Sequence, residues 1–289
     1  AHHTGGGQAT RPTAPAVSGT TPVMILRPSW SWTAGGGGNG TFQWQLDGTG
    51  GWTQTTQTTL TAATDLAEGN HTLAVQERDA AGNWSVSGYF TIVIDLTAPT
   101  APTVSGATPV NTVRPSWSWT AGGDGNGTFR WDIDNTGSWT ETAATMLAAP
   151  VDLMEGTHRL AVQERDVAGN WSASGSFDVV IDLTAPTAPT VSGSAITNEP
   201  KPTWSWTAGG EGNGTFRWDI DNTGSWTETV QLSLTSPGNL STGDHILAVQ
   251  ERDAAGNWST SGSFTTTVDL VAPTISVTPR VTSDPKPII

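Results

Sequence analysis

The chain has 289 residues, and its composition already excludes several classes of protein. It carries 12 Lys and Arg against 26 Asp and Glu, a formal net charge of −14 that repels nucleic-acid phosphates and anionic membranes. We therefore expect no nucleic-acid partner, and no membrane insertion because no apolar run approaches the roughly 20 residues of a spanning helix. The absence of Cys excludes a disulfide framework, a zinc–thiolate site and a thiol nucleophile.

The sequence repeats itself at a fixed spacing of 87 residues. Trp30-Ser31-Trp32 recurs from Trp117 and again from Trp204, and each repeat holds five of the 15 Trp. A unit of this length matches a small sandwich domain, whereas solenoid units of about 20–50 residues cannot stand alone. We predict a tag remnant and linker at 1–11, domains at 12–98, 99–185 and 186–272, and the start of a truncated fourth repeat at 273–289.

The apolar period within one repeat is two residues, which predicts strands rather than helices. Trp30 and Trp32 share one face of such a strand, and Trp44 lies on the inward register of the next predicted strand. These three Trp are predicted to be core residues of an all-β sandwich. In chain order, the strands predicted for the first repeat lie around residues 16–17, 30–33, 42–46, 52–55, 58–62, 73–75 and 90–94.

Two motifs carry a resemblance to a known family. The run VQERDAAGNWS at residues 75–85, followed by VIDLTAPT at residues 93–100, resembles bacterial immunoglobulin-like tandem repeats of large surface or secreted adhesins. The resemblance implies three tandem immunoglobulin-like β-sandwich domains arranged end to end. It also implies a non-catalytic extender or stalk segment at the bacterial cell surface, whose partners are neighbouring repeats. A glycan or host receptor would be bound through other parts of the full-length protein.

The joints between repeats are candidate calcium sites. The sandwich topology places the second-to-third and sixth-to-seventh strand turns at the end where the chain enters each domain, beside the end of the preceding repeat. Ca²⁺ takes six to eight oxygen ligands from carboxylates, amides and carbonyls. The alternative is that each Asp caps a turn and that the linker is a simple bend. The candidate metal ligands are Asp95, Asp124, Asp166 and Asn170 at the first joint, and Asp182, Glu211, Asp253 and Asn257 at the second.

Two further titratable positions recur once in each repeat. Glu77 lies on the inward register of its strand, and a buried carboxylate needs a partner, so we expect an ion pair with a nearby Arg or Lys such as Arg27 or Arg78. His71 starts the same strand and is expected to close the preceding corner by a hydrogen bond. Neither position predicts an enzyme.

Tryptophans beside turns offer a binding function. An exposed Trp on a rigid β-scaffold can stack on a sugar ring, which would make a carbohydrate-binding module; alternatively, each Trp packs over a loop or a neighbouring domain. A third possibility is a filament subunit in which the truncated repeat at 273–289 is completed by a strand of another chain. The candidate ligand-binding residues are Trp52, Trp84, Trp139, Trp171, Trp226 and Trp258.

Overall fold

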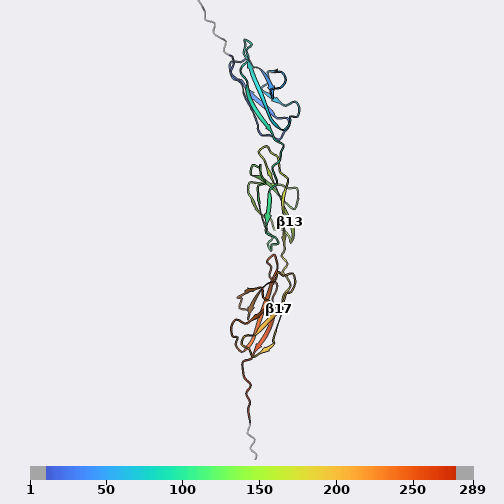
Figure 1. Ribbon diagram of the computed structural model, residues 1–289, viewed down its shortest axis with the longest axis vertical. Helices are drawn as coiled ribbons and strands as arrows, with labels where there is room; N and C mark the ends of the chain where they lie inside the picture. The colour runs from blue at the N-terminus through green and yellow to red at the C-terminus, as the bar shows by residue number, and fades with distance from the viewer. Residues whose placement is uncertain (1–10, 278–289) are drawn as a thin grey trace, which may run out of the picture. The chain divides into compact units, whose positions relative to one another are not determined.

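The computed structural model describes residues 11–277, which form strands and turns and no helix (Figure 1). None of these residues therefore belongs to a helix long and apolar enough to cross a membrane. The predicted tag remnant, apart from Arg11, and residues 278–289 of the predicted fourth repeat lie outside the described residues. Residues 273–277 are described and contain no strand.

The first repeat folds into two antiparallel sheets, as its alternating pattern predicts. One sheet has the order β1-β2-β5 and the other the order β4-β3-β6-β7. All seven predicted strands are present, and the sixth is longer than predicted. Their bounds are β1 (Ala16–Gly19), β2 (Ser29–Thr33), β3 (Thr41–Leu46), β4 (Thr53–Thr55), β5 (Thr59–Thr61), β6 (Gly69–Arg78) and β7 (Gly88–Ile94).

The second repeat keeps this arrangement, with sheets β12-β9-β8 and β11-β10-β13-β14 (Figure 1). Its strands are β8 (Thr103–Gly106), β9 (Ser116–Thr120), β10 (Thr128–Ile133), β11 (Thr140–Thr142), β12 (Met146–Ala148), β13 (Gly156–Arg165) and β14 (Gly175–Ile181).

The third repeat has sheets β15-β17-β20 and β16-β22-β21-β18-β19. The added strand β16 pairs parallel with β22, where the first two repeats have only the single parallel bridges Val23 to Ile94 and Val110 to Ile181. The strands are β15 (Thr190–Gly193), β16 (Ile196–Thr197), β17 (Thr203–Thr207), β18 (Thr215–Ile220), β19 (Thr227–Thr229), β20 (Ser233–Thr235), β21 (Gly243–Arg252) and β22 (Gly262–Val268).

The core of each sandwich is centred on the two Trp of its second strand. Trp30 and Trp32 are 1% and 3% exposed, and Trp32 meets Phe42 edge to face with ring centroids 6.1 Å apart. Trp44 packs partly buried against the same cluster, so all three predicted core Trp are confirmed. Such rings bury a large apolar area each, which lets a chain with few other large apolar residues form a core.

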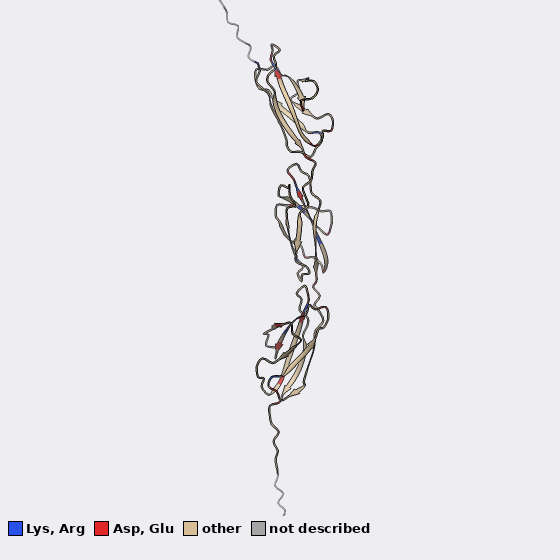
Figure 2. Cartoon of the chain, viewed as in Figure 1, with Lys and Arg blue, Asp and Glu red and all other residues tan. Residues whose placement is uncertain are grey.

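Most of the ribbon is neither acidic nor basic (Figure 2).

The described chain separates into two compact units. The first contains the described residues up to Ala107 together with Arg114–Val151 and Thr157–Val179; the second contains Thr108–Val113, Asp152–Gly156 and the residues from Val180 onward. The contacts that join the first repeat to the second lie inside the first unit. Those that join the second repeat to the third lie inside the second unit.

The loop between β2 and β3 lies at the end of the first repeat where the chain enters, as the topology predicts. Thr13 N donates to Gly36 O over 3.1 Å, and Asn39 N donates to Arg78 O over 2.8 Å. Gly35 is required here, because a Cβ would lie 2.3 Å from the carbonyl oxygen of Thr13. This loop and the turn between β6 and β7 therefore share one end of the sandwich.

One core hydrogen bond distinguishes the third repeat. Trp204 Nε1 donates to the buried Thr266 Oγ1 over 3.0 Å, whereas Nε1 of Trp30 and of Trp117 is buried without a partner. The residues that correspond to Thr266 are Ile92 and Val179, which offer no acceptor. The indole of Trp204 is thus the one whose buried donor is satisfied among these three.

We expect Thr266→Val to destabilise the chain by about 1–2 kcal/mol, because the indole N–H of Trp204 would be left buried and unpaired. Urea unfolding followed by Trp fluorescence measures the change. Thr265→Val is the matched control, because Thr265 is exposed on the neighbouring position of the same strand. Equal losses in both variants would contradict the assignment.

Candidate functional site

The turn between the last two strands of each repeat is closed by one carboxylate. In the second repeat, Asp166 Oδ1 accepts from Gly169 N (2.6 Å) and Asn170 N (2.8 Å), and Oδ2 accepts from Asn170 Nδ2 (2.8 Å). Burial alone would raise the pKa of Asp166, but the bonds from Asn170 and Gly169 outweigh it and hold the pKa below its ordinary value. The carboxylate therefore folds the turn and fixes the Asn side chain.

The same Asn side chain reaches the preceding repeat. Asn170 Nδ2 also donates to the backbone oxygen of Asp95 over 2.8 Å. At the second joint, Asn257 Nδ2 makes the same two bonds, to Asp253 Oδ2 (2.9 Å) and to the backbone oxygen of Asp182 (2.8 Å). The predicted proximity of these residues is thus observed, but the two repeats meet through a backbone carbonyl rather than through the Asp95 carboxylate.

A second contact at each joint comes from the loop before the second strand of the preceding repeat. Gly169 has φ +109°, and a Cβ at this position would lie 3.1 Å from Met24 Sδ. At the second joint, Asn111 occupies the corresponding place, 3.5 Å from the Cβ position of Gly256. Sequence reasoning missed Met24, although the apolar run at residues 23–26 of a loop is a signal that could have found it.

The linker after each sandwich is bent by its own Asp. Asp95 Oδ1 accepts from Thr97 N over 3.0 Å, and Thr97 Oγ1 donates to Glu68 Oε1 over 2.7 Å. The second linker repeats both bonds, from Asp182 to Thr184 and from Thr184 to Glu155. Each linker is thereby fastened to the sandwich that it leaves.

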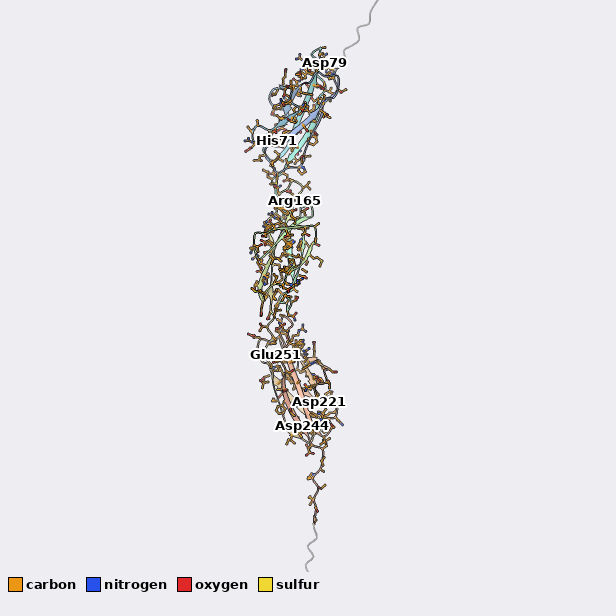
Figure 3. The ribbon with its side chains drawn as sticks, turned by 180° about the vertical axis from the view of Figure 1, so that it is seen from behind. His71, Asp79, Arg165, Asp221, Asp244 and Glu251 are labelled. Carbon is orange, nitrogen blue, oxygen red and sulfur yellow. The ribbon has the colours of Figure 1, made fainter. Side chains whose placement is uncertain are left out.

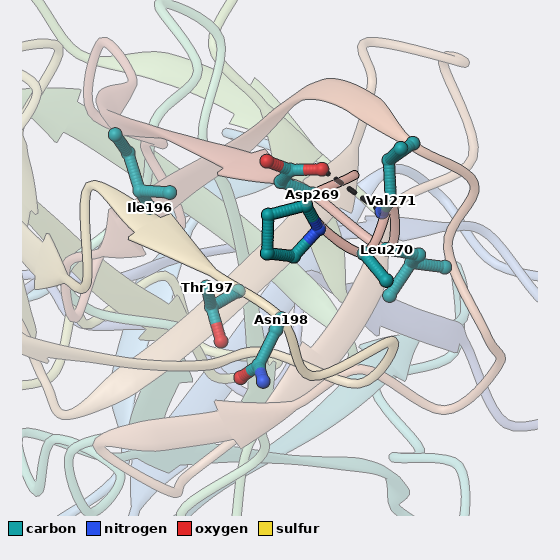
Figure 4. Close-up of a pocket in the computed structure, with 8 residues that line it drawn as sticks. Ile196, Thr197, Asn198, Asp269, Leu270 and Val271 are labelled. Atoms are coloured by element: carbon teal, nitrogen blue, oxygen red, sulfur yellow. Dashed lines mark hydrogen bonds between the residues drawn. The ribbon is translucent and has the colours of Figure 1, made fainter. Parts of the chain in front are cut away.

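The third linker keeps the bend, but its second fastening is a longer hydrogen bond, from Leu270 N to Thr242 Oγ1 over 3.4 Å. Asp269 Oδ1 accepts from Val271 N over 3.0 Å, but Val271 has no hydroxyl, and Thr242 stands where the earlier repeats have Glu. A hollow of about 690 Å³ lies at this end of the repeat (Figure 4). It is lined by Ile196, Thr197, Asn198, Asp269, Leu270 and Val271, among others.

The remaining candidate metal ligands take no part in the hydrogen bonds described at the joints. Asp124 and Glu211 are exposed, in left-handed backbone with φ of 62° and 64°. Within residues 11–277, no three His, Cys, Asp or Glu side chains are grouped so that they could hold a metal ion. Calcium at the joints stays a prediction, and the observed bonds are those of the alternative, in which Asp caps a turn.

The recurrent His closes a corner, as predicted, and links it to a second turn. His71 Nδ1 bonds Asp47 Oδ2 over 2.7 Å, and His71 Nε2 bonds Ala67 O over 2.8 Å. His245 bonds Asp221 and the carbonyl of Ser241 in the same way. His71 lies toward the opposite end of the first sandwich from Asp79 (Figure 3).

The predicted ion pair of the buried Glu is wrong. Glu77 is 2% exposed, yet its Oε2 accepts from the backbone N of Gly35 over 3.2 Å, and no ion pair to it is found in residues 11–277. Arg27 instead bonds Asp65 on the surface. A Cβ on Gly38 would lie 2.0 Å from Glu77 Cδ, so the carboxylate holds the loop between β2 and β3 through close backbone contact.

The six candidate ligand-binding Trp are divided by how they pack. Trp171 is stacked between Arg130 and Arg165, whose Cζ atoms lie 4.3 Å and 5.4 Å from the ring centroid, and Arg130 also covers Trp139 at 4.8 Å. The third repeat copies this stack with Trp226 and Trp258. Trp84 has one Arg neighbour, Arg78, and Trp52 is the most exposed of the six, at 38%.

A family match agrees with the fold of the third repeat, and a known relative matches part of the chain. Residues 185–270 match the family described as Bacterial Ig-like domain, which confirms the resemblance to bacterial immunoglobulin-like repeats for the third repeat. Chitinase A1 of Niallia circulans is 29% identical over 195 residues, which are 63% of this chain and 28% of the chitinase. The chain thus spans less than a third of that relative.

Two solved structures cover most of the chain. One concerns host cell surface retention of a 1.5-MDa bacterial ice-binding adhesin; it is 17% identical, covers 91% of this chain and 100% of its own, and has a TM-score of 0.46. The other comprises the FN1–FN3 domains of chicken CNTN1, with 13% identity, coverage of 89% and 99%, and a TM-score of 0.37.

The His corners predict how stability depends on pH. Burial lowers the pKa of His71, but the bonds to Asp47 and to the Ala67 carbonyl outweigh it, and the bond to Asp221 is the main cause that raises the pKa of His245. A raised native pKa gives stability that is complete below the unfolded value of about 6.5 and is lost as pH rises through the native value. We therefore expect a higher melting temperature at pH 5.5 than at pH 8.5.

The double variant His71→Asn with His245→Asn should flatten this dependence when melting is followed by circular dichroism. Below pH 4 the melting temperature should instead fall as the pH is lowered. The lowered pKa values of Asp79, Asp166 and Asp253 give stability that is lost as these carboxylates are protonated. An unchanged difference between pH 5.5 and 8.5 in the double variant would rule out the His corners as its source.

Proposed function

We propose that the chain is a non-catalytic spacer segment of a bacterial surface or secreted protein, in which successive immunoglobulin-like domains hold one another at restrained joints. The main support is the side chain of Asn170, which bonds the turn of its own repeat and the last residues of the repeat before it. Asn257 repeats this arrangement at the second joint. A spacer transmits position along its length only if its joints resist bending.

The first repeat supports the same interpretation. Asn83 Nδ2 donates to Asp79 Oδ2 over 3.0 Å, so the turn is closed as in the other repeats. No joint bond corresponding to that of Asn170 is found at Asn83 within the described residues. Within the described residues, the turn of the first repeat is thus closed by its carboxylate without a bond to a preceding repeat.

The linkers support restraint as well. Thr97 is fastened to Asp95 and Glu68 of the repeat that it leaves, and the following Pro99 is buried. Proline removes backbone freedom, so a short linker of this kind behaves as a stiff connector rather than a flexible coil. Bonds on both sides of a short segment limit the angles that it can adopt.

The relatives favour two settings for such a spacer. Membership of the third repeat in a bacterial Ig-like family favours a surface or secreted protein, as the resemblance to adhesin repeats implies. The match to part of a chitinase favours a second setting, in which such repeats separate the parts of a secreted enzyme. In either setting the partners of each repeat are its neighbours in the same chain.

The joint bond can be tested by distance measurements between repeats. Spin labels on Thr59→Cys and Met146→Cys, both exposed, would be specific because the chain has no native Cys. We expect a broader distance distribution in Asn170→Ala, because losing a net contribution of about 1 kcal/mol raises the undocked population about fivefold. Pulsed electron–electron double resonance measures this distance distribution directly.

Asn83→Ala is the matched control for this experiment. It removes the same bond to the turn carboxylate in the first repeat but no bond to a preceding repeat, so the distribution should stay narrow. A distribution that is equally broad in the native protein and in Asn170→Ala would show that the joint is free, and the spacer would then be a flexible one.

Calcium at the joints remains a separate proposal, with Asp95, Asp124, Asp166 and Asn170 as the ligands to test first. An ion that binds only the folded chain raises the melting temperature by mass action. We therefore expect a rise of several degrees in excess Ca²⁺ over the chelated protein, and a smaller rise in Asp124→Asn. Equal melting temperatures with and without chelator would contradict calcium binding and leave the Asn bonds and linker packing as the restraint.

A further inference from the structure

The outer face of the four-stranded sheet differs between the first repeat and the other two. In the second repeat, Arg130 on β10 lies between Glu141 on β11 and Gln163 on β13. In the first repeat the corresponding positions all carry neutral amides. Gln43 on β3 lies between Gln54 on β4 and Gln76 on β6.

In the second repeat, Arg side chains stack over the Trp rings of this face. Arg130 lies over both Trp139 and Trp171 and donates its Nε proton to Gln163 Oε1 over 2.7 Å. Arg165 lies 4.0 Å from Glu141 at the closest N to O approach. Cation–π contacts therefore cover part of the aromatic surface of this face.

The first repeat lacks the Arg that makes this stack. Gln43 cannot cover Trp52 as Arg130 covers Trp139, and Trp52 is 38% exposed. The register that pairs Trp44 with Thr53 carries Trp52 to the position beside Gln45 on β3. An open indole thus lies next to an amide side chain on a rigid sheet.

A second aromatic ring stands on the far side of the same cross-strand row. Gln45 pairs with Ala74 on β6, and Ala74 pairs with Tyr89 on β7. Tyr89 is the one Tyr of the chain and is 65% exposed, whereas the other repeats have Ser176 and Ser263 there. Three spacings between neighbouring strands separate the strand positions of Trp52 and Tyr89 by about 14 Å.

The amides on this face are held in place. Gln43 Nε2 donates to Gln76 Oε1 (2.6 Å), Gln76 Nε2 donates to Ser87 Oγ (3.0 Å), and Gln45 Nε2 donates to Gly50 O (2.8 Å). Each primary amide has two donors and an acceptor with two lone pairs, so these bonds leave capacity for a ligand. Fixed side chains lose less entropy when a ligand binds.

From this arrangement we propose that the outer face formed by Trp52, Gln45, Ala74, Gln76 and Tyr89 binds a neutral glycan chain. The two rings stack on the apolar faces of pyranose rings, and the amides on either side of Ala74, which is itself only 8% exposed, bond sugar hydroxyls. Gln43 and Gln54, where the second repeat has Arg130 and Glu141, lack the charges that would favour an ionic ligand. A span of about 14 Å accommodates a few sugar rings.

Calorimetric titration of the full chain with cellohexaose, chitohexaose and mannohexaose tests the proposal. We expect one of these neutral oligosaccharides to bind at one site per chain. Trp52→Ala and Tyr89→Ser should each weaken binding at least about tenfold, because each removes a stacking ring. Tyr89→Ser introduces the residue that the other repeats carry, so the sheet tolerates it.

Trp139→Ala is the matched control, since it removes the corresponding ring of the second repeat and should leave the affinity unchanged. The introduction of the second repeat's charges, by Gln45→Asp with Gln54→Glu, should weaken binding without removing an aromatic ring. The proposal is overturned if none of the three oligosaccharides binds, or if binding is the same in Trp52→Ala and Tyr89→Ser as in the native chain.

Discussion

The joints of this chain depend on the hydrogen bonds accepted by the carboxylates of Asp166 and Asp253. By accepting from Gly169 and from both nitrogens of Asn170, Asp166 closes the turn and fixes the direction of the Asn amide. The amide held in this way presents its second proton to the backbone oxygen of Asp95. A flexible Asn would lose rotamer entropy on forming that bond, and the net gain would be smaller.

The repeat resolves the roles of residues that a single domain would leave ambiguous. Inward-facing Trp, turn Asp and corner His are kept in all three copies because the sandwich needs them for burial and for closing its backbone. On the outer face of the four-stranded sheet the first copy departs from the others at Gln43, Gln45 and Tyr89, although the residue at the position of Gln45 still bonds the next turn in each copy. Divergence on an unchanged scaffold therefore marks surface chemistry.

The sequence was sufficient for the parts that depend on periodicity and turn chemistry. Alternation located every strand of the first repeat, and strand order placed Asn170 beside Asp95. It could not show that the contact uses the Asp95 carbonyl, because backbone acceptors leave no trace in residue types. The prediction for Glu77 was wrong because it assumed a charged partner. The carboxylate instead accepts from the backbone N–H of Gly35, in a loop whose glycines allow the close approach.

Stiff joints and an open glycan-binding face would support one another physically. A face on one domain meets a polysaccharide in a defined orientation only if the neighbouring domains hold that domain, and each freely turning joint would add an orientational cost to binding. The face lies on the sheet β4-β3-β6-β7, whereas the contacts of the first joint are made by the backbone oxygen of Asp95 after β7 and by Met24. The two proposed functions would use different surfaces of the same sandwich, so neither would restrict the sequence available to the other.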